Sequence, residues 1–133
     1  KLWDRSYTPS RGGDARTMDT NRRSIGASLG PETQEWLAAC PLSWNSGNLW
    51  VVHAGADPAR PMTEQTARVQ LWGHPEFDSM PRVDDAWVAH GHVVRDAPIV
   101  RDGRISLDTG AWTTGKLSCI AIQPDGSYTF LQT

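Results

Sequence analysis

Two histidines, His53 and His92, each lie close to a glycine at the end of a short apolar run, in the segments 50–55 and 87–92. Both runs are rich in β-branched and aromatic residues, which favours strands. A strand that ends in this way delivers the imidazole to the edge of a sheet, where it can bind a metal ion or a phosphate group. A single histidine of this kind is more often a hydrogen-bonded structural residue, so the argument depends on the pair.

The first part of the chain predicts little regular structure. Residues 1–30 are expected to form a loop or lid, because Ser, Gly, Arg, Asp and Thr occur there without a sustained apolar period. A short helix is expected to begin at Pro31 and to carry Trp36 and Leu37 inward onto a sheet, before Pro41 stops it.

The remainder of the chain alternates between helical and strand-like segments. Strands are expected over residues 48–53 and 87–90, separated by a helix that Thr63 caps and that extends to about Gln70. Two hairpins are then expected, because Asp-Gly pairs between apolar runs favour tight turns. Their strands are residues 98–101 with 104–107, and 116–122 with 127–131. This order predicts a mixed α/β sheet structure.

Composition narrows the classes of partner and location. The 133 residues carry a formal charge of -2, so the totals show no footprint for duplex nucleic acid or for an anionic membrane. No apolar run is long enough to span a bilayer, and no leader opens the sequence, so the expected location is the cytoplasm. The seven tryptophans are expected to stiffen a core.

Three motifs together resemble one known family. They are His53-Ala54-Gly55, Gly91-His92, and the stretch from Asp108-Thr109-Gly110-Ala111 to Lys116. In this order they resemble the second half of the calcineurin-like metallophosphoesterases, nearest to the bacterial serine/threonine protein phosphatase and symmetrical diadenosine tetraphosphatase branch. The resemblance runs from about Pro31 to the end. It implies that residues 31–133 form the C-terminal half of a four-layer α/β/β/α sandwich.

The resemblance also implies a site with two metal ions, which can be manganese, iron or zinc. In the family the two matching histidines bind the same cation, so His53 and His92 are expected to be its ligands. His90 is expected to support this site or to be plain structure. Asp108 is expected to accept hydrogen bonds from loop amides or from a metal-bound histidine, with a polar turn cap as the alternative. Val93 departs from the family, in which threonine is usual after Gly-His.

A further departure concerns phosphate binding. His74, in Leu71-Trp72-Gly73-His74, stands where the family usually has an arginine that grips phosphate. Histidine offers fewer donors than the arginine fork and titrates near neutrality. Weaker and more pH-sensitive phosphate binding through His74 is therefore predicted, and a loop histidine without a ligand is the alternative.

The family motifs that supply the bridging aspartate, the first metal and the acid histidine do not occur in these 133 residues. We therefore expect the N-terminal half of the domain to be a missing partner, and this chain alone to be inactive. In the intact protein the expected activity is hydrolysis of phosphate esters, either in phosphoproteins or in dinucleoside polyphosphates. The alternatives are a non-catalytic, tryptophan-rich interaction domain and a mononuclear zinc hydrolase.

Overall fold

The structure is a computed structural model that describes the backbone of residues 15–133 and the side chains of residues 23–133. The chain divides into two compact units, residues 1–41 and 42–133. Each unit is described by itself below.

The described part of the first unit is the helix α1 (Ala15–Ala39), which is kinked at Gly30 (φ 73°, ψ 161°). Pro31 begins the second arm of the helix, as expected. Residues 15–29, however, are helical and do not form the expected loop, while residues 1–14 lie outside the described residues. Where its side chains are described, from residue 23 onward, the helix shows no buried apolar stripe, and Ile25, Leu29, Trp36 and Leu37 are exposed. Trp36, expected to point inward, is 66% exposed.

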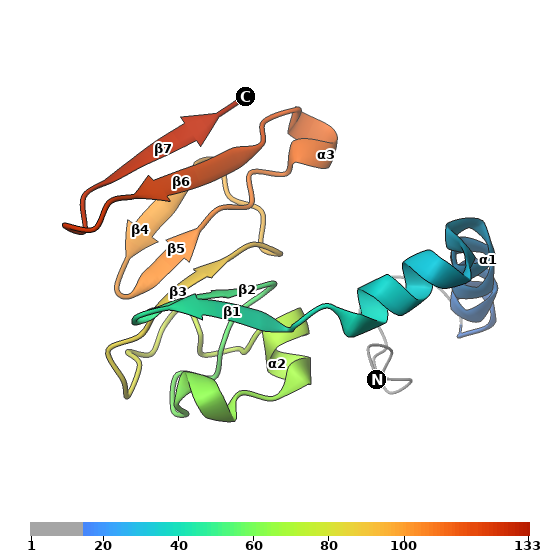
Figure 1. The fold of residues 1–133 in the computed structure, drawn as a ribbon, viewed down its shortest axis with the longest axis horizontal. Coiled ribbons are helices and arrows are strands. Elements are labelled where there is room, and N and C mark those ends of the chain that lie inside the picture. Colours follow the sequence, from blue (N-terminus) through green and yellow to red (C-terminus); the bar gives the residue numbers. More distant parts are fainter. Residues whose placement is uncertain (1–14) are drawn as a thin grey trace. The chain divides into compact units, whose positions relative to one another are not determined.

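The second unit is built on a five-stranded mixed sheet with the order β1-β2-β3-β5-β4 (Figure 1). The three central strands are parallel, and the two outer strands pair antiparallel to their neighbours. A separate antiparallel hairpin, β6–β7, completes the unit. The strands are β1 (Ser43–Ser46), β2 (Leu49–Val52), β3 (Trp87–His90), β4 (Ile99–Arg101), β5 (Arg104–Ser106), β6 (Ser118–Ile122) and β7 (Tyr128–Gln132). The predicted mixed α/β class is confirmed, as are both hairpins.

Short helices connect these strands. They are the 3-10 helix η1 (Met62–Glu64), α2 (Ala67–Trp72) and α3 (Ala111–Thr114). The helix after β2 is capped by Thr66 and not by Thr63, because only the Thr66 hydroxyl reaches the free N–H of Val69. Figure 1 shows α2 and the β6–β7 hairpin at opposite ends of this unit. No helix in the described part of the chain is long and apolar enough to cross a membrane.

The core of the second unit lies against one face of the five-stranded sheet. Its buried members are Val52, Ala56, Met62, Phe77, Ala86 and Val88. Tryptophans contribute less than expected, since only Trp50 packs against this core. Trp44, Trp72, Trp87 and Trp112 are all more than one-third exposed. The expectation that tryptophans stiffen the core is therefore wrong for most of those whose side chains are described.

Candidate functional site

His53 and His92 lie at the carboxyl edge of the sheet, directly after two adjacent parallel strands. His53 follows the last residue of β2, and His92 follows β3 after Gly91. The N–H of Gly91 donates to the carbonyl oxygen of His53 at 2.9 Å, which extends the ladder between the two strands to the site. The carboxyl ends of parallel strands meet at one edge, so the fold brings together two residues that are distant in sequence.

The two imidazoles are close enough to share one cation. Nε2 of His53 lies 3.2 Å from Nδ1 of His92, and the rings meet edge to face. Two nitrogen ligands about 2.0–2.1 Å from one tetrahedral zinc ion would lie roughly 3.3–3.4 Å apart. The observed 3.2 Å is slightly shorter than this span and close enough for both nitrogens to reach one ion. In the metal-free protein the same distance allows one ring to donate an N–H to the other.

The backbone at His92 holds the ring in an unusual position. His92 has a φ of 66°, a left-handed value that is uncommon for residues other than glycine. The N–H of Val93 donates to the carbonyl oxygen of Gly91 at 2.7 Å, which closes a γ-turn with His92 at its centre. Such backbone strain clusters at functional sites. The turn projects the His92 ring into solvent beside His53.

The buried side chain of His90 contacts the backbone of this turn. Its ring is 3% exposed and lies 3.2 Å, through Nδ1, from the carbonyl oxygen of Gly91. Because a carbonyl can only accept, Nδ1 carries the proton, and Nε2 is then free to accept from the Ser106 hydroxyl at 2.9 Å. Burial lowers the pKa of His90, which favours this neutral form. The ring of His90 is thus bound to Gly91 and Ser106, and it fixes the backbone that leads to His92.

The electrostatics at His53 favour a neutral ring. Partial burial, followed by the neighbouring His92, lowers the pKa of His53, while the carboxylate of Asp108 acts in the opposite direction. A neutral imidazole is the form that binds metal ions. Oδ1 of Asp108 accepts from the N–H of Gly110 at 2.9 Å, which is the polar turn cap considered from the sequence.

The histidine pair opens into a pocket of about 340 Å³ at the carboxyl edge. Among its lining residues are both histidines, His90, Asp108 and Lys116, and to Lys116 the sequence interpretation assigned no role in the site. His74 is not among them. Its Nδ1 accepts from the N–H of Glu76 at 3.3 Å, just beyond α2. The preceding Trp72 does reach the site, with its ring 5.9 Å from that of His92.

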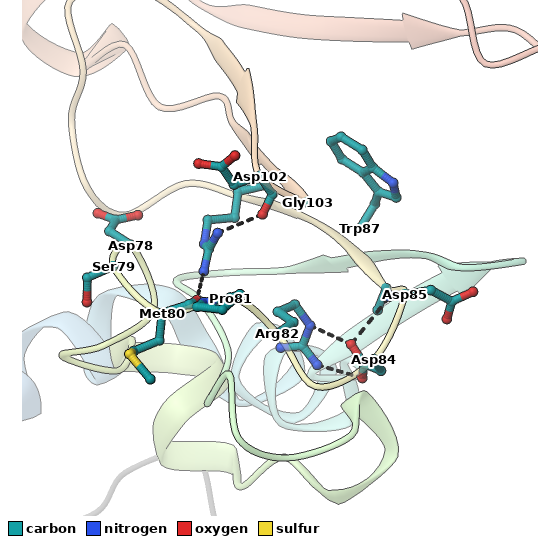
Figure 2. A pocket seen from close by; sticks show the side chains of 12 residues that line it. Asp78, Ser79, Met80, Pro81, Arg82, Asp84, Asp85, Trp87, Asp102 and Gly103 are labelled. Carbon is teal, nitrogen blue, oxygen red and sulfur yellow. Dashed lines mark hydrogen bonds and ion pairs between the residues drawn. The ribbon is translucent and has the colours of Figure 1, made fainter.

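A second pocket, of about 550 Å³, lies at the amino ends of β3 and β5. Figure 2 shows its aspartates and the bidentate pair between Arg82 and Asp84, in which both hydrogen bonds are 2.7 Å long. Its other guanidinium, that of Arg104, donates to the carbonyl oxygens of Phe77, Met80 and Asp102. Both guanidinium groups thus already bind protein groups and are not free for a ligand. The residues that line this pocket include no histidine.

The donor set at the carboxyl edge is small. Among the side chains of residues 23–133, no group of three or more His, Cys, Asp or Glu is placed to hold a metal ion. The described part of the chain therefore supplies two imidazole ligands, and a tightly bound ion would need further ligands.

Comparison with solved structures shows a similar fold. One solved chain, described as a "putative diadenosine tetraphosphatase", superposes with a TM-score of 0.60 at 22% sequence identity, over 86% of this chain. This chain spans 61% of the length of that chain. No family profile and no curated protein matches the sequence. The mixed α/β unit is thus consistent with part of a metallophosphoesterase fold.

Proposed function

We propose that this chain supplies part of the active site of a metal-dependent phosphoesterase, in which His53 and His92 bind one cation. The observation that carries the proposal is the 3.2 Å separation of their ring nitrogens at the carboxyl edge of parallel strands. Ligands of α/β proteins bind preferentially at this edge. The likeness of fold to the solved chain described above agrees with the same class of hydrolase.

The donor chemistry fits the metal ions of such a site. Neutral imidazoles suit zinc and iron, and manganese accepts them together with carboxylates. When bound, the cation acts as a Lewis acid toward a phosphate oxygen. His53 and His92 would hold the ion, the γ-turn would position the His92 ring, and the pocket beside them would enclose the ester. The ligands of the second cation and the acid histidine would be supplied by residues other than these.

The proposed substrate is a phosphate ester, either a dinucleoside polyphosphate or a phosphorylated protein. The reaction is attack of water on phosphorus with release of an alcohol or a nucleotide. The description of the solved chain favours the dinucleoside polyphosphate. A choice between the two requires hydrolysis to be compared on diadenosine tetraphosphate and on a phosphoserine peptide in a protein that carries the complete ligand set.

The proposed partner is the other half of the sandwich. Trp44 and Val51 are cross-strand neighbours on the sheet face opposite the core, and they are 58% and 40% exposed. Trp87, 37% exposed, lies on the same face. Exposed apolar residues grouped on one sheet face are suited to packing against a second sheet. Ala89 and Ile105 on this face are already buried, so a second layer supplied by the same longer protein would cover its exposed part and bring the remaining metal ligands.

The proposal is tested by titrating zinc into the 133-residue chain and measuring the heat of binding. One ion per chain is expected, and both His53→Ala and His92→Ala should lower the affinity at least 10-fold. His74→Ala is the matched control, because His74 lies outside the pocket, and its affinity should stay within twofold of the wild type. An equal zinc affinity of all four proteins would contradict the proposed site.

A second measurement addresses catalysis. Because two ligands do not assemble a dinuclear site, the chain alone should not hydrolyse p-nitrophenyl phosphate in the presence of manganese. Metal-dependent turnover by this chain, lost in His53→Ala, would show that the site is complete without a further half.

A further inference from the structure

We infer that Lys116 is the phosphate-binding residue of the pocket that contains His53 and His92. The inference rests on the proposed function and deepens it, since it names the group that would hold the anionic substrate. Among the described residues that line this pocket, Lys116 is the only lysine or arginine. Lysine carries a positive charge that does not depend on a bound metal ion, so Lys116 can attract an anion to this pocket.

The backbone of Lys116 is fixed by two threonine side chains. The hydroxyl of Thr109 donates to the carbonyl oxygen of Lys116 at 2.6 Å, and the N–H of Lys116 donates to the hydroxyl of Thr114 at 3.1 Å. Thr109 is 4% exposed and also bonds the hydroxyl of Ser118 at 2.8 Å. The backbone from which the lysine side chain extends is thus held by these two hydrogen bonds, of which the one from Thr109 is partly buried.

The charged end of Lys116 is available to a ligand. Within the described residues its ammonium makes no ion pair and no hydrogen bond, and the residue is exposed. A lysine ammonium binds phosphate oxygens as a compact point charge. The pocket also contains the carboxylate of Asp108, which would repel an anion. The ammonium of Lys116 offsets this repulsion and makes the pocket suitable for a phosphoryl group.

Lys116 is better placed for this role than His74, the residue that the sequence suggested. His74 does not line the pocket, and one of its ring nitrogens already accepts a backbone hydrogen bond from Glu76. Histidine is also charged only below about neutral pH, whereas lysine stays charged. Phosphate binding at this site should therefore persist at pH 8, where an imidazole carries almost no charge.

The experiment uses the fact that the chain contains only two lysines, Lys1 and Lys116. Reductive methylation with ¹³C-formaldehyde retains their charge and labels both side chains together with the terminal amine. Phenylphosphonate, an analogue of a phosphate monoester that is not hydrolysed, is then titrated at pH 8 and constant ionic strength, first without and then with one equivalent of zinc. The methyl signal of Lys116, assigned by its loss in Lys116→Arg, should shift in a saturable manner.

Three variants, enriched in ¹⁵N and not methylated, test the affinity by ¹⁵N chemical shifts. Lys116→Met should weaken phenylphosphonate binding at least 10-fold, and Lys116→Arg should stay within threefold of the wild type. Arg68→Met removes one exposed charge that does not line the pocket, so it should stay within twofold. Zinc affinity should be unchanged within twofold in Lys116→Met, which shows that the variant retains the histidine pair.

Two results would overturn the inference. Phenylphosphonate could bind Lys116→Met as tightly as it binds the wild type. Alternatively, Arg68→Met could lose as much affinity as Lys116→Met, which would indicate that the net charge of the protein, and not a specific site, governs the binding. Failure of the proposed metal site is separate. If zinc binding does not depend on His53 or His92, the proposed function falls, while the titration without zinc still decides the role of Lys116.

Discussion

His90 donates from Nδ1 to the carbonyl oxygen of Gly91, the residue that carries the γ-turn at His92. Replacing the His90 ring should therefore change metal binding indirectly, through the backbone that positions His92. His90→Asn keeps an amide donor near the position of Nδ1, whereas His90→Gln places its amide nearer Ser106. Zinc affinity should fall by up to about 10-fold in His90→Gln and less in His90→Asn, as for other residues that orient a ligand. Calorimetry measures both, and an equal loss would argue for a packing effect alone.

The left-handed backbone of His92 predicts a difference between two variants that both lose the imidazole. Alanine at a φ of 66° is strained, whereas glycine is not. His92→Gly should therefore be more stable toward urea than His92→Ala by about 1 kcal/mol. Neither should bind zinc at the wild-type affinity. Equal unfolding midpoints would mean that the turn relaxes once the ring is removed.

Gly55 and Phe77 test why the segment after His53 needs a glycine. A Cβ atom at Gly55 would lie 2.9 Å from Cδ1 of Phe77, which is closer than real side chains approach. Phe77 is 4% exposed and stacks edge to face on His90, so it has little room to move. Gly55→Ala should cost about 1–3 kcal/mol of stability, the range for overpacking.

The matched control for this overpacking is a double variant. Phe77→Leu shortens the side chain that the new methyl group would meet, so Gly55→Ala/Phe77→Leu should be more stable than the sum of the two single losses predicts. Urea unfolding of the four proteins gives the coupling. Strict additivity would show that Gly55 is needed for a reason other than Phe77.

Much of the fold could be predicted from local patterns. The strand β3 follows from its apolar run, and the turn at Asp102-Gly103 follows from two residues that tolerate positive φ, observed at 51° and 76°. The helix α1 before Gly30 could not be predicted from periodicity, because a helix with exposed apolar residues carries no stripe. The edge strand β1 was missed for the same reason, since three of its four residues are exposed.

The site divides in a similar way. His53 and His92 could be found because each ends a recognisable strand, and parallel pairing then brings them together. Lys116 ends one of the motifs found in the sequence, but its place in the pocket could not be predicted, because it reaches the pocket through a loop whose path depends on the hydroxyls of Thr109 and Thr114. Side chain-to-backbone bonds of this kind leave no periodic signal in a sequence. The buried partnership of His90 with Ser106 is likewise a product of strand register.

The ion pair of Arg82 and Asp84 predicts how stability depends on pH. The Arg82 side chain is 3% exposed, and both of its hydrogen bonds to Asp84 are 2.7 Å long. Partial burial alone would raise the pKa of Asp84, but the bonds and charge of Arg82 outweigh it and lower the pKa below its usual value. The folded protein thus favours the carboxylate. This stabilisation is complete above the unfolded pKa, near 4, and is lost as the pH falls through the lower folded value.

Wild-type stability toward urea should therefore decrease between pH 5 and pH 2.5, and Asp84→Asn should show a shallower decrease over the same interval. At pH 7 the variant should be less stable by about 1–3 kcal/mol, because the buried guanidinium keeps its donors but loses the carboxylate. Asp85→Asn is the control, since the exposed side chain of Asp85 makes no ion pair within the described residues. It should keep the wild-type slope, and tryptophan fluorescence follows all three proteins. If Asp84→Asn loses stability with acid as steeply as the wild type, other carboxylates govern the transition.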